Sequence, residues 1–324
     1  MDIFNLDKLG VSSKEVQRYI DRTKNNEVSA AITGEFSAGK STFINALLNK
    51  PQFLSSKNTE CTPIFIEIKK GNEENIIITK KDHTHEIQEF HDKNIKTLTT
   101  YTSDYNDDIL SITLPIKTEY INQTISIIDT PGTNTIIKEH EIITKYILKK
   151  VDIVLYLVDK VISYTDVEKI KEIKEYTNHI IIIATHMDEK INGTWLNIPK
   201  NEIDKLTNTI ESQLEKEQIT DIEILPIGSL SAYNDNSLII QIRELINEYV
   251  DSNSQNVIKN RVKKQLNLLF EKIISDKKLE ISTYETLKGI DISQIEHKVK
   301  NIENEIEKIQ LKGNRAISKI ESDD

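Results

Sequence analysis

The sequence predicts an α/β fold in which a mostly parallel sheet carries helices on both faces, followed by a helical C-terminal region. Between residues 28 and 250, short apolar runs of strand length alternate with longer runs in which apolar residues recur every three or four positions. This alternation is typical of a sheet whose parallel strands are joined by helices. From about residue 251 the strand-like runs end and only the helical periodicity continues.

The composition narrows the possible partners and the location of the protein. The chain has 324 residues and a net charge of −10, and an acidic surface disfavours the phosphate backbone of nucleic acid. Nucleic acid is therefore not an expected partner. Its single cysteine permits no internal disulfide, no N-terminal stretch resembles a signal peptide, and no run reaches the roughly 18 apolar residues of a membrane span. We expect a cytoplasmic protein.

The first expected element is a helix over residues 12–26. Ser12 or Ser13 would cap it, and its apolar residues, which include Val16 and Ile20, fall on one side. This helix precedes the first strand and must pack against another part of the chain. We treat residues 1–27 as a separate N-terminal helical segment.

A glycine-rich stretch follows the first strand and leads into the next helix. Gly34, Gly39, Lys40 and Ser41 match the phosphate-loop pattern G-x-x-x-x-G-K-[ST]. In such a loop backbone N–H groups and the helix N-terminus bind the β-phosphate, the lysine approaches the β and γ oxygens, and the serine ligates Mg²⁺. A turn that binds nothing is the alternative, and the strand–loop–helix order disfavours it. The expected phosphate-binding residues are Gly34, Glu35, Phe36, Ser37, Ala38, Gly39, Lys40, Ser41 and Thr42.

The tetrapeptide DTPG, at 129–132, ends a second apolar strand. Asp129 is expected to bind Mg²⁺ through water, and the Gly132 N–H is expected to contact the γ-phosphate. A nucleotide switch also needs a threonine that reaches Mg²⁺ when the γ-phosphate is present. Thr59 and Thr62 are both candidates, and we prefer Thr62 because it directly precedes the strand at 64–68.

Two later loops are expected to bind a guanine base. Asp188, in THMD after a strand, can accept both the N1–H and the N2 amino group of guanine, a pair of donors that adenine lacks. Guanine-reading loops usually have lysine where His186 stands, and imidazole can stack there too. A cap on the following segment is the alternative role of Asp188. The expected base-binding residues are Thr185, His186, Asp188, and Ser229 or Leu230 through a backbone N–H.

The C-terminal region, residues 251–324, predicts a helical hairpin. Lys288 and Gly289 interrupt two series of apolar residues, of which the second follows a heptad spacing. The two helices either close a bundle with the N-terminal helix or form an intermolecular coiled coil. The two series are Ile258, Val262, Leu266, Leu269 and Ile273, and Ile292, Ile295, Val299, Ile302, Ile306 and Ile309.

These motifs together resemble the dynamin superfamily. GEFSAGKSTFINALL, CTP, TISIIDTPGTNT and VDIVLYLVD occur in register, so residues 28–250 look like a P-loop GTPase domain of the bacterial dynamin-like branch. The flanking segments resemble an α-helical neck bundle built from both ends of the chain. Two features differ from the family: Phe36 stands where eukaryotic dynamins have a catalytic glutamine, and the C-terminal region is too short for a full stalk and lipid-binding tip. The chain is either a short member of the family or part of a longer protein.

The resemblance implies a GTP hydrolase that uses GTP, GDP and Mg²⁺, with Ser37, Lys40, Thr62 and Gly132 as its catalytic residues. No arginine lies between the phosphate loop and the segment DTPGTNT, so the site needs completion from outside. The family supplies this through a homodimer of GTPase domains or association with a second dynamin-like protein, and a monovalent cation such as K⁺ beside Ser37 would add positive charge.

Membrane remodelling or tethering, at the periphery of a membrane, is the function that the resemblance implies. The sequence shows no apolar paddle or basic tip for lipid. A GTP-dependent switch or scaffold that assembles on a protein partner is therefore the alternative. An ATP-using kinase or motor is a third possibility, against which Asp188 argues.

Overall fold

The computed structural model describes residues 27–35, 37–54, 64–73, 75–80, 84–91, 95, 108–130, 144–145, 147–175, 177, 179–286 and 292–322. The chain divides into two compact units. The larger comprises Val28–Ser252, and the smaller includes the described residues from Asn253 onward.

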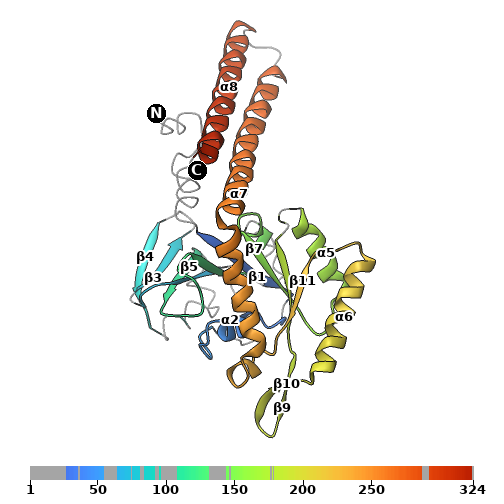
Figure 1. Ribbon diagram of the computed structural model, residues 1–324. Coiled ribbons are helices and arrows are strands. Elements are labelled where there is room, and N and C mark those ends of the chain that lie inside the picture. Colours follow the sequence, from blue (N-terminus) through green and yellow to red (C-terminus); the bar gives the residue numbers. More distant parts are fainter. Residues whose placement is uncertain are drawn as a thin grey trace. The chain divides into compact units, whose positions relative to one another are not determined.

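The larger unit is built on a sheet that has nine strands among the described residues, in the order β11-β8-β7-β1-β6-β2-β5-β3-β4 (Figure 1). Five of its pairings are parallel: β1 with β6 and β7, β7 with β8, β8 with β11, and β2 with β5. The pairs β2–β6, β3–β5 and β3–β4 are antiparallel. The prediction of a mostly parallel sheet is confirmed. The strands are β1 Val28–Gly34, β2 Phe65–Lys70, β3 Asn75–Lys80, β4 His85–Glu89, β5 Ile109–Ile116, β6 Ile125–Asp129, β7 Ile153–Val158, β8 Ile180–Ala184 and β11 Glu223–Pro226.

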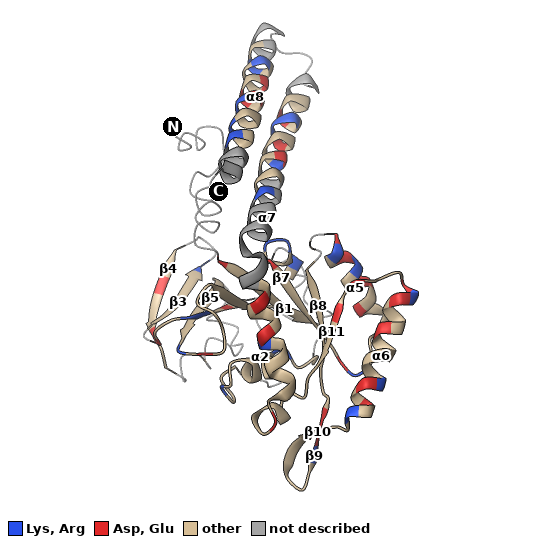
Figure 2. Ribbon diagram, viewed as in Figure 1, with Lys and Arg blue, Asp and Glu red and all other residues tan. Residues whose placement is uncertain are grey.

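The middle of the sheet is buried on both faces. Every residue of β1 and of β7 is buried, as expected of parallel strands covered by helices on either side. Helices α5 (Tyr164–Lys174) and α6 (Lys200–Lys216) share one hydrophobic core with alternate residues of β7 and β8. Figure 2 shows both basic and acidic residues along α6, as in a helix with one solvated face.

Helix α2 (Lys40–Leu47) and the part of helix α7 (Ser237–Thr286) up to residue 252 lie in front of the strands in Figure 1. Arg243 of α7 donates two hydrogen bonds to the last turn of α2, from Nε to the carbonyl of Leu47 at 2.9 Å and from Nη2 to that of Ala46 at 2.8 Å. Its guanidinium carbon lies 3.9 Å from the ring centroid of Tyr120. A charged side chain therefore ties α7 to the carboxyl end of α2, where cations are favoured.

A separate two-stranded antiparallel sheet follows β8. It consists of β9 (Asp188–Ile191) and β10 (Thr194–Asn197), joined at Asn192 and Gly193. Both linking residues have positive φ, 50° and 88°, as the two central residues of a type I′ hairpin turn do. The sequence analysis did not predict this hairpin, although Asn-Gly is the strongest short-range hairpin signal.

The smaller unit contains the end of α7 and the helix α8 (Ile292–Ser322). Helix α7 is continuous across residue 252, because no glycine or proline interrupts 237–286. Between the helices, Lys277 forms an ion pair with Glu305 at 3.0 Å. At Gly313 of α8 a Cβ would lie 2.9 Å from the ring of Phe270, so the absence of a side chain there lets the helices approach.

The helix expected at 12–26 lies outside the described residues. None of the helices that the structure describes is both long and apolar enough to span a membrane.

Candidate nucleotide-binding site

The candidate site lies at one edge of the sheet. Strands β11, β8, β7, β1 and β6 are consecutive neighbours and mutually parallel, so their carboxyl ends meet at the same edge. Parallel sheets bind ligands in this position. Every expected nucleotide-binding residue within the described part of the chain lies at the carboxyl end of one of these strands, in the loop that follows it, or at the start of the next helix or strand.

The phosphate loop depends on the absence of a side chain at its first position. Gly34 has a φ of +146°, and a Cβ there would lie 2.4 Å from the carbonyl oxygen of Leu157 in β7. Gly39, directly before α2, has a φ of +82°. These two glycines let the chain turn from β1 into α2 against the neighbouring strand.

The lysine of the motif is bonded to the phosphate loop itself. Lys40, the first residue of α2, donates from Nζ to the carbonyls of Gly34 at 3.0 Å and Glu35 at 2.7 Å. The ammonium therefore lies across the loop. Gly39 caps α2 without a side-chain hydrogen bond, and the first turn of α2 holds no acidic residue. A helix N-terminus of this kind, beside a lysine, suits an anion.

The remaining residues of the loop differ in exposure. Ser37 is exposed and has a φ of 70°, whereas Ala38 is buried. Ser41 and Thr42 are half-buried in the first turn of α2. Phe36 lies outside the described residues.

Asp129 ends β6, next to β1. The residue is half-buried, but its Oδ1 is inaccessible to solvent and has no hydrogen-bond partner among the described residues. Burial raises the pKa of Asp129 to about 7, and the charge of Lys40 opposes this shift. The next residue, Thr130, anchors the strand end by donating from Oγ1 to the carbonyl of Ile32 at 2.9 Å.

A carboxylate oxygen with no protein donor fits a hard divalent cation, which prefers oxygen ligands. Asp129 and the hydroxyl of Ser41 are therefore the described residues that fit Mg²⁺. Thr62, its alternative Thr59, and Gly132 lie outside the described residues.

The loop after β8 packs against the phosphate loop. The Thr185 hydroxyl lies 2.9 Å from the carbonyl oxygen of Val158 and 3.1 Å from that of Ala38. His186 has a φ of 60°, and its Nδ1 lies 3.0 Å from Oδ1 of Asp159, at the end of β7. The structure thus joins three strand ends at this point.

Asp188 has a structural partner that the sequence analysis missed. Its Oδ2 accepts hydrogen bonds from the backbone N–H groups of Leu230 at 2.8 Å and Ser231 at 2.9 Å. Oδ1 accepts none from the described residues. The carboxylate therefore holds the loop after β11 in place and keeps one oxygen for another donor.

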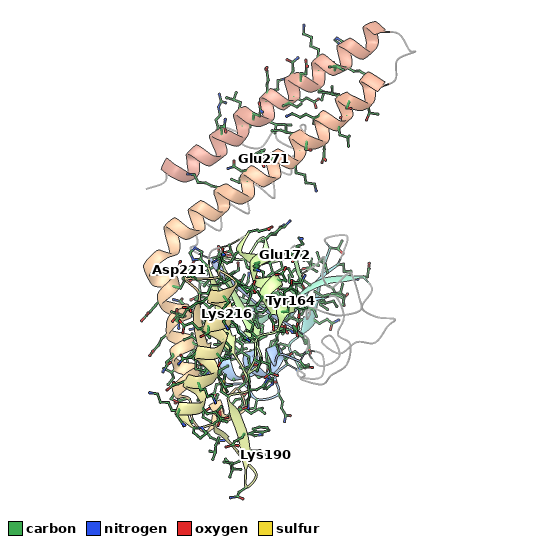
Figure 3. The ribbon with its side chains drawn as sticks, turned by 90° about the vertical axis from the view of Figure 1, so that its right-hand side faces the viewer. Tyr164, Glu172, Lys190, Lys216, Asp221 and Glu271 are labelled. Carbon is green, nitrogen blue, oxygen red and sulfur yellow. The ribbon has the colours of Figure 1, made fainter. Side chains whose placement is uncertain are left out.

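The loop after β11 is tightly packed. A Cβ on Gly228 would lie 2.3 Å from Oγ of Ser231 and 2.8 Å from Cβ of Asp188. Ser229 is buried, and its Oγ has no partner in the described part of the chain. Asn234 donates from Nδ2 to the carbonyl of Trp195 in β10 at 3.1 Å, so the hairpin braces this loop. Figure 3 shows Lys190 near the far end of the hairpin.

A hydrogen-bond network from α5 also reaches the phosphate loop. The Glu35 carboxylate accepts hydrogen bonds from Ser163 Oγ at 3.1 Å and from Thr165 Oγ1. Ser163 caps α5 in a capping box with Asp166, whose pKa is raised by burial. Beside this cap, the side chain of Tyr164 is exposed (Figure 3). The Ser-x-x-Asp spacing of the capping box was visible in the sequence, but its contact with Glu35 was not.

Comparisons with known proteins show a similarity of sequence and of fold. Residues 30–188 match the model of the Dynamin family. Dynamin-like protein 1 of Campylobacter jejuni subsp. jejuni serotype O:23/36 (strain 81-176) is 25% identical, in an alignment that covers 46% of this chain and 25% of that protein.

Two solved structures, described as an oligomerised bacterial dynamin pair for the long-range sensing and tethering of membranes, have a similar fold. One has a TM-score of 0.55 at 19% identity, and the match covers 95% of this chain and 50% of the chain in that structure. The other has a TM-score of 0.53 at 20% identity, and the match covers 88% of this chain and 55% of the chain in that structure. The chain thus spans about half the length of these structures and a quarter of the curated relative. Residues 30–188 therefore match the Dynamin family, and the chain has the fold of the bacterial dynamin pair.

Proposed function

We propose that this chain binds GTP and GDP with Mg²⁺ at the carboxyl edge of its sheet, and that the bound nucleotide controls the association of GTPase domains at a membrane. One observation carries the nucleotide site. Lys40 at the N-terminus of α2, the unpartnered oxygen of Asp129 and the carboxylate of Asp188 follow three strands of one parallel set. Lys40 suits a phosphate chain, Asp129 suits a cation, and Asp188 suits a base.

In this proposal the phosphate loop, residues 34–42, holds the α- and β-phosphates through backbone N–H groups, and Lys40 neutralises charge on the β and γ oxygens. Ser41, Asp129 and Thr62 hold Mg²⁺, which when bound adds positive charge to the same oxygens. The N–H of Gly132 contacts the γ-phosphate. Thr59 is the alternative to Thr62.

The base end reads guanine through Asp188. Oδ1 is open for one guanine donor, and Oδ2 already accepts two backbone N–H groups. Recognition by both oxygens therefore requires the backbone at Leu230 to shift or to share its acceptor. The backbone N–H of Ser229 or Leu230 is proposed to contact the guanine oxygen. Thr185 and His186 complete this end of the site.

The base assignment is tested with Asp188→Asn. An asparagine amide can place an NH₂ group opposite the N2 amino group of guanine, whereas xanthine presents a carbonyl there and pairs with it. We expect the variant to lose GTP affinity and gain affinity for xanthosine triphosphate, measured by competition against fluorescent GDP and fluorescent xanthosine diphosphate. Wild-type protein that binds ATP and GTP equally would refute the assignment. Because Asp188 also holds the loop after β11, circular dichroism must first show that the variant is folded.

Hydrolysis in this proposal requires a partner. The only arginine in the described part of the larger unit, Arg243, binds the carboxyl end of α2, opposite the end that faces the phosphates. It is not placed to stabilise charge on a γ-phosphate. Ser37, whose side chain is exposed, is available for a monovalent cation such as K⁺ or for a second GTPase domain. We propose a homodimer or a pair with a second dynamin-like protein.

This requirement predicts that GTPase activity per molecule rises with protein concentration and with K⁺. The measurement is specific activity across a wide dilution series, paired with sedimentation in GDP and aluminium fluoride. Fast, concentration-independent turnover by a species that remains monomeric with the analogue would show that one chain completes its own site.

The helical segments are proposed to link the state of the bound nucleotide to an action on a membrane. Residues 1–27 and 251–324 act as the neck of the GTPase domain at 28–250, and the unbroken helix α7 contains residues of both parts. The similarity to a bacterial dynamin pair for membrane tethering supports membrane remodelling or tethering, with the protein peripheral to the membrane. Co-sedimentation with liposomes, with and without GTP, tests this. GTP-dependent assembly that never includes lipid would favour a protein scaffold instead.

A further inference from the structure

We propose that strand β4 is an interface at which a second copy of this chain pairs its own β4 in antiparallel orientation. β4 is the last strand in the order of the sheet, so among the described strands its only neighbour is β3 (Figure 1). An edge strand presents backbone donors and acceptors to which another strand can pair. The five residues of β4 include neither lysine nor proline, which commonly prevent such pairing.

The register of β3 with β4 shows which backbone groups of β4 point outward. The N–H of Lys80 donates to the carbonyl of Thr84 at 2.9 Å, directly before the first residue of β4. In an antiparallel pair, residues that exchange hydrogen bonds with the neighbouring strand alternate with residues that do not. The even-numbered residues of β4 therefore bond to β3, and the N–H and C=O groups of residues 85, 87 and 89 point away from it.

The side chains of these odd-numbered residues lie on one face of the sheet. Ile87 is 67% exposed on this face, and Ile77, which lies opposite it in β3, is 38% exposed. On the other face, Ile76 and Ile78 of β3 are buried. The edge of the sheet thus exposes a pair of isoleucines on a single face, and removing this apolar surface from water is favourable.

The sequence of β4 is complementary to itself when two copies run antiparallel with Ile87 opposite Ile87. His85 of each copy then lies opposite Glu89 of the other, and residues opposite each other in an antiparallel pair contact each other. Because this register is centred on an outward-pointing residue, the outward N–H and C=O groups of the two strands meet. The two-fold axis also places the isoleucines 77 and 87 of both copies in one row.

Both polar side chains of this match are accessible. Oγ1 of Thr79 lies 3.2 Å from Nδ1 of His85, a contact that does not involve Nε2. Glu89 forms an ion pair with His91 at 3.0 Å, and its side chain is 81% exposed. A carboxylate has about four lone-pair sites, so it can accept from His85 of a second copy and keep this ion pair.

This interface differs from the GTPase-domain association proposed above and does not rest on it. β4 is four strands away from β6, which ends at Asp129, and neighbouring strands are about 4.8 Å apart, so the two strands are about 19 Å apart. Each of the two interfaces joins two copies, so a chain that has both can join more than two. Only the association at the nucleotide site would then depend on the nucleotide.

The test is sedimentation velocity in EDTA without nucleotide, so that nucleotide-dependent association does not contribute. Five residue pairs make a small interface, and we expect a dissociation constant on the order of 10–100 µM, measured across about 5–500 µM protein. Ile87→Lys places like charges opposite each other and should raise this constant at least about tenfold. The matched control is Ile240→Lys, at a 37% exposed position of α7, which should leave the constant unchanged.

A charge exchange tests the antiparallel register. His85→Glu and Glu89→Lys each remove the match of a basic with an acidic residue, so either one alone should weaken the dimer. The double variant places opposite charges across both halves of the pair again and should restore the dimer. Hydrogen exchange at residues 85–89 should also slow as the wild-type concentration rises.

A wild-type protein that stays monomeric up to about 500 µM would overturn the proposal. A dimer that Ile87→Lys does not weaken, such as one formed through the helices of the smaller unit, would overturn it too, as would a double variant that associates no more tightly than the single variants. Circular dichroism establishes that each variant is folded. If Ile87→Lys does not fold, the charge exchange at the exposed positions 85 and 89 decides.

Discussion

Asp129→Asn is expected to stabilise the nucleotide-free protein while it weakens Mg²⁺-dependent nucleotide binding. The negative charge of this carboxylate is poorly compensated in the nucleotide-free protein, because its Oδ1 is buried without a hydrogen-bond partner among the described residues. Burial raises the pKa of Asp129 from 3.8 to about 7, and the charge of Lys40 offsets only part of this. Asparagine has nearly the same shape and no charge to desolvate.

The sign and size of the effect follow from this pKa. The folded state binds the Asp129 proton more tightly than the unfolded chain, so the free energy of unfolding falls as the pH rises from about 4 to 7, and the full cost is present above pH 7. At about 1.4 kcal/mol per pKa unit, the shift corresponds to about 4 kcal/mol. Asp129 is half-buried and solvent screens part of its charge, so we expect about 2 kcal/mol.

The assay is urea denaturation at pH 5 and pH 8 in EDTA without nucleotide. Wild-type protein should lose about 1 kcal/mol more than Asp129→Asn between these two pH values, because part of the cost is already present at pH 5. Asp152→Asn is the matched control. In the wild type, Oδ2 of Asp152 accepts hydrogen bonds from the N–H of Ser29 at 2.8 Å and from the hydroxyl of Ser29 at 2.9 Å. That variant should be less stable than wild type by about 1–3 kcal/mol. If Asp129→Asn is also less stable at pH 8, the carboxylate has a compensating partner and the reasoning is wrong.

Three other substitutions test the contacts that position the site. Asn45→Ala removes two hydrogen bonds, at 2.8 and 2.9 Å, between the buried amide of Asn45 and the backbone of Leu54. It should lower the free energy of unfolding by about 2–4 kcal/mol, measured by urea denaturation. A loss below about 0.5 kcal/mol would contradict this prediction. Arg243→Met leaves the last carbonyls of α2 unpaired and should lower the thermal midpoint by several degrees in calorimetry, corresponding to about 1–3 kcal/mol; an unchanged midpoint would show that water replaces the guanidinium. Gly228→Ala places a Cβ 2.8 Å from Cβ of Asp188 and should weaken GDP binding at least about tenfold, while weak ADP binding stays as it is in the wild type. Unchanged GDP affinity would show that the base binds elsewhere.

Local patterns in the sequence predicted the fold class and the phosphate loop. The strand Val28–Gly34, the turn at Gly39 and the helix from Lys40 are continuous in the chain, so periodicity and a short motif describe them. The motifs also carried the resemblance to dynamins, which the family match at 30–188 supports. The hairpin at 188–197 was open to the same reasoning through Asn192 and Gly193, but was not predicted.

The sequence by itself determined which residues follow the strand ends; only the tertiary structure decided which of them meet. Burial of apolar strands selects the strand order, and that order places Asp159 beside His186, 27 positions away, and Thr165 beside Glu35, 130 positions away. It also gives Asp188 two backbone donors from Leu230 and Ser231. Periodicity records the direction of a side chain within its own helix or strand. It carries no information about a partner brought near by the packing of another element, which is why these contacts had to be found in three dimensions.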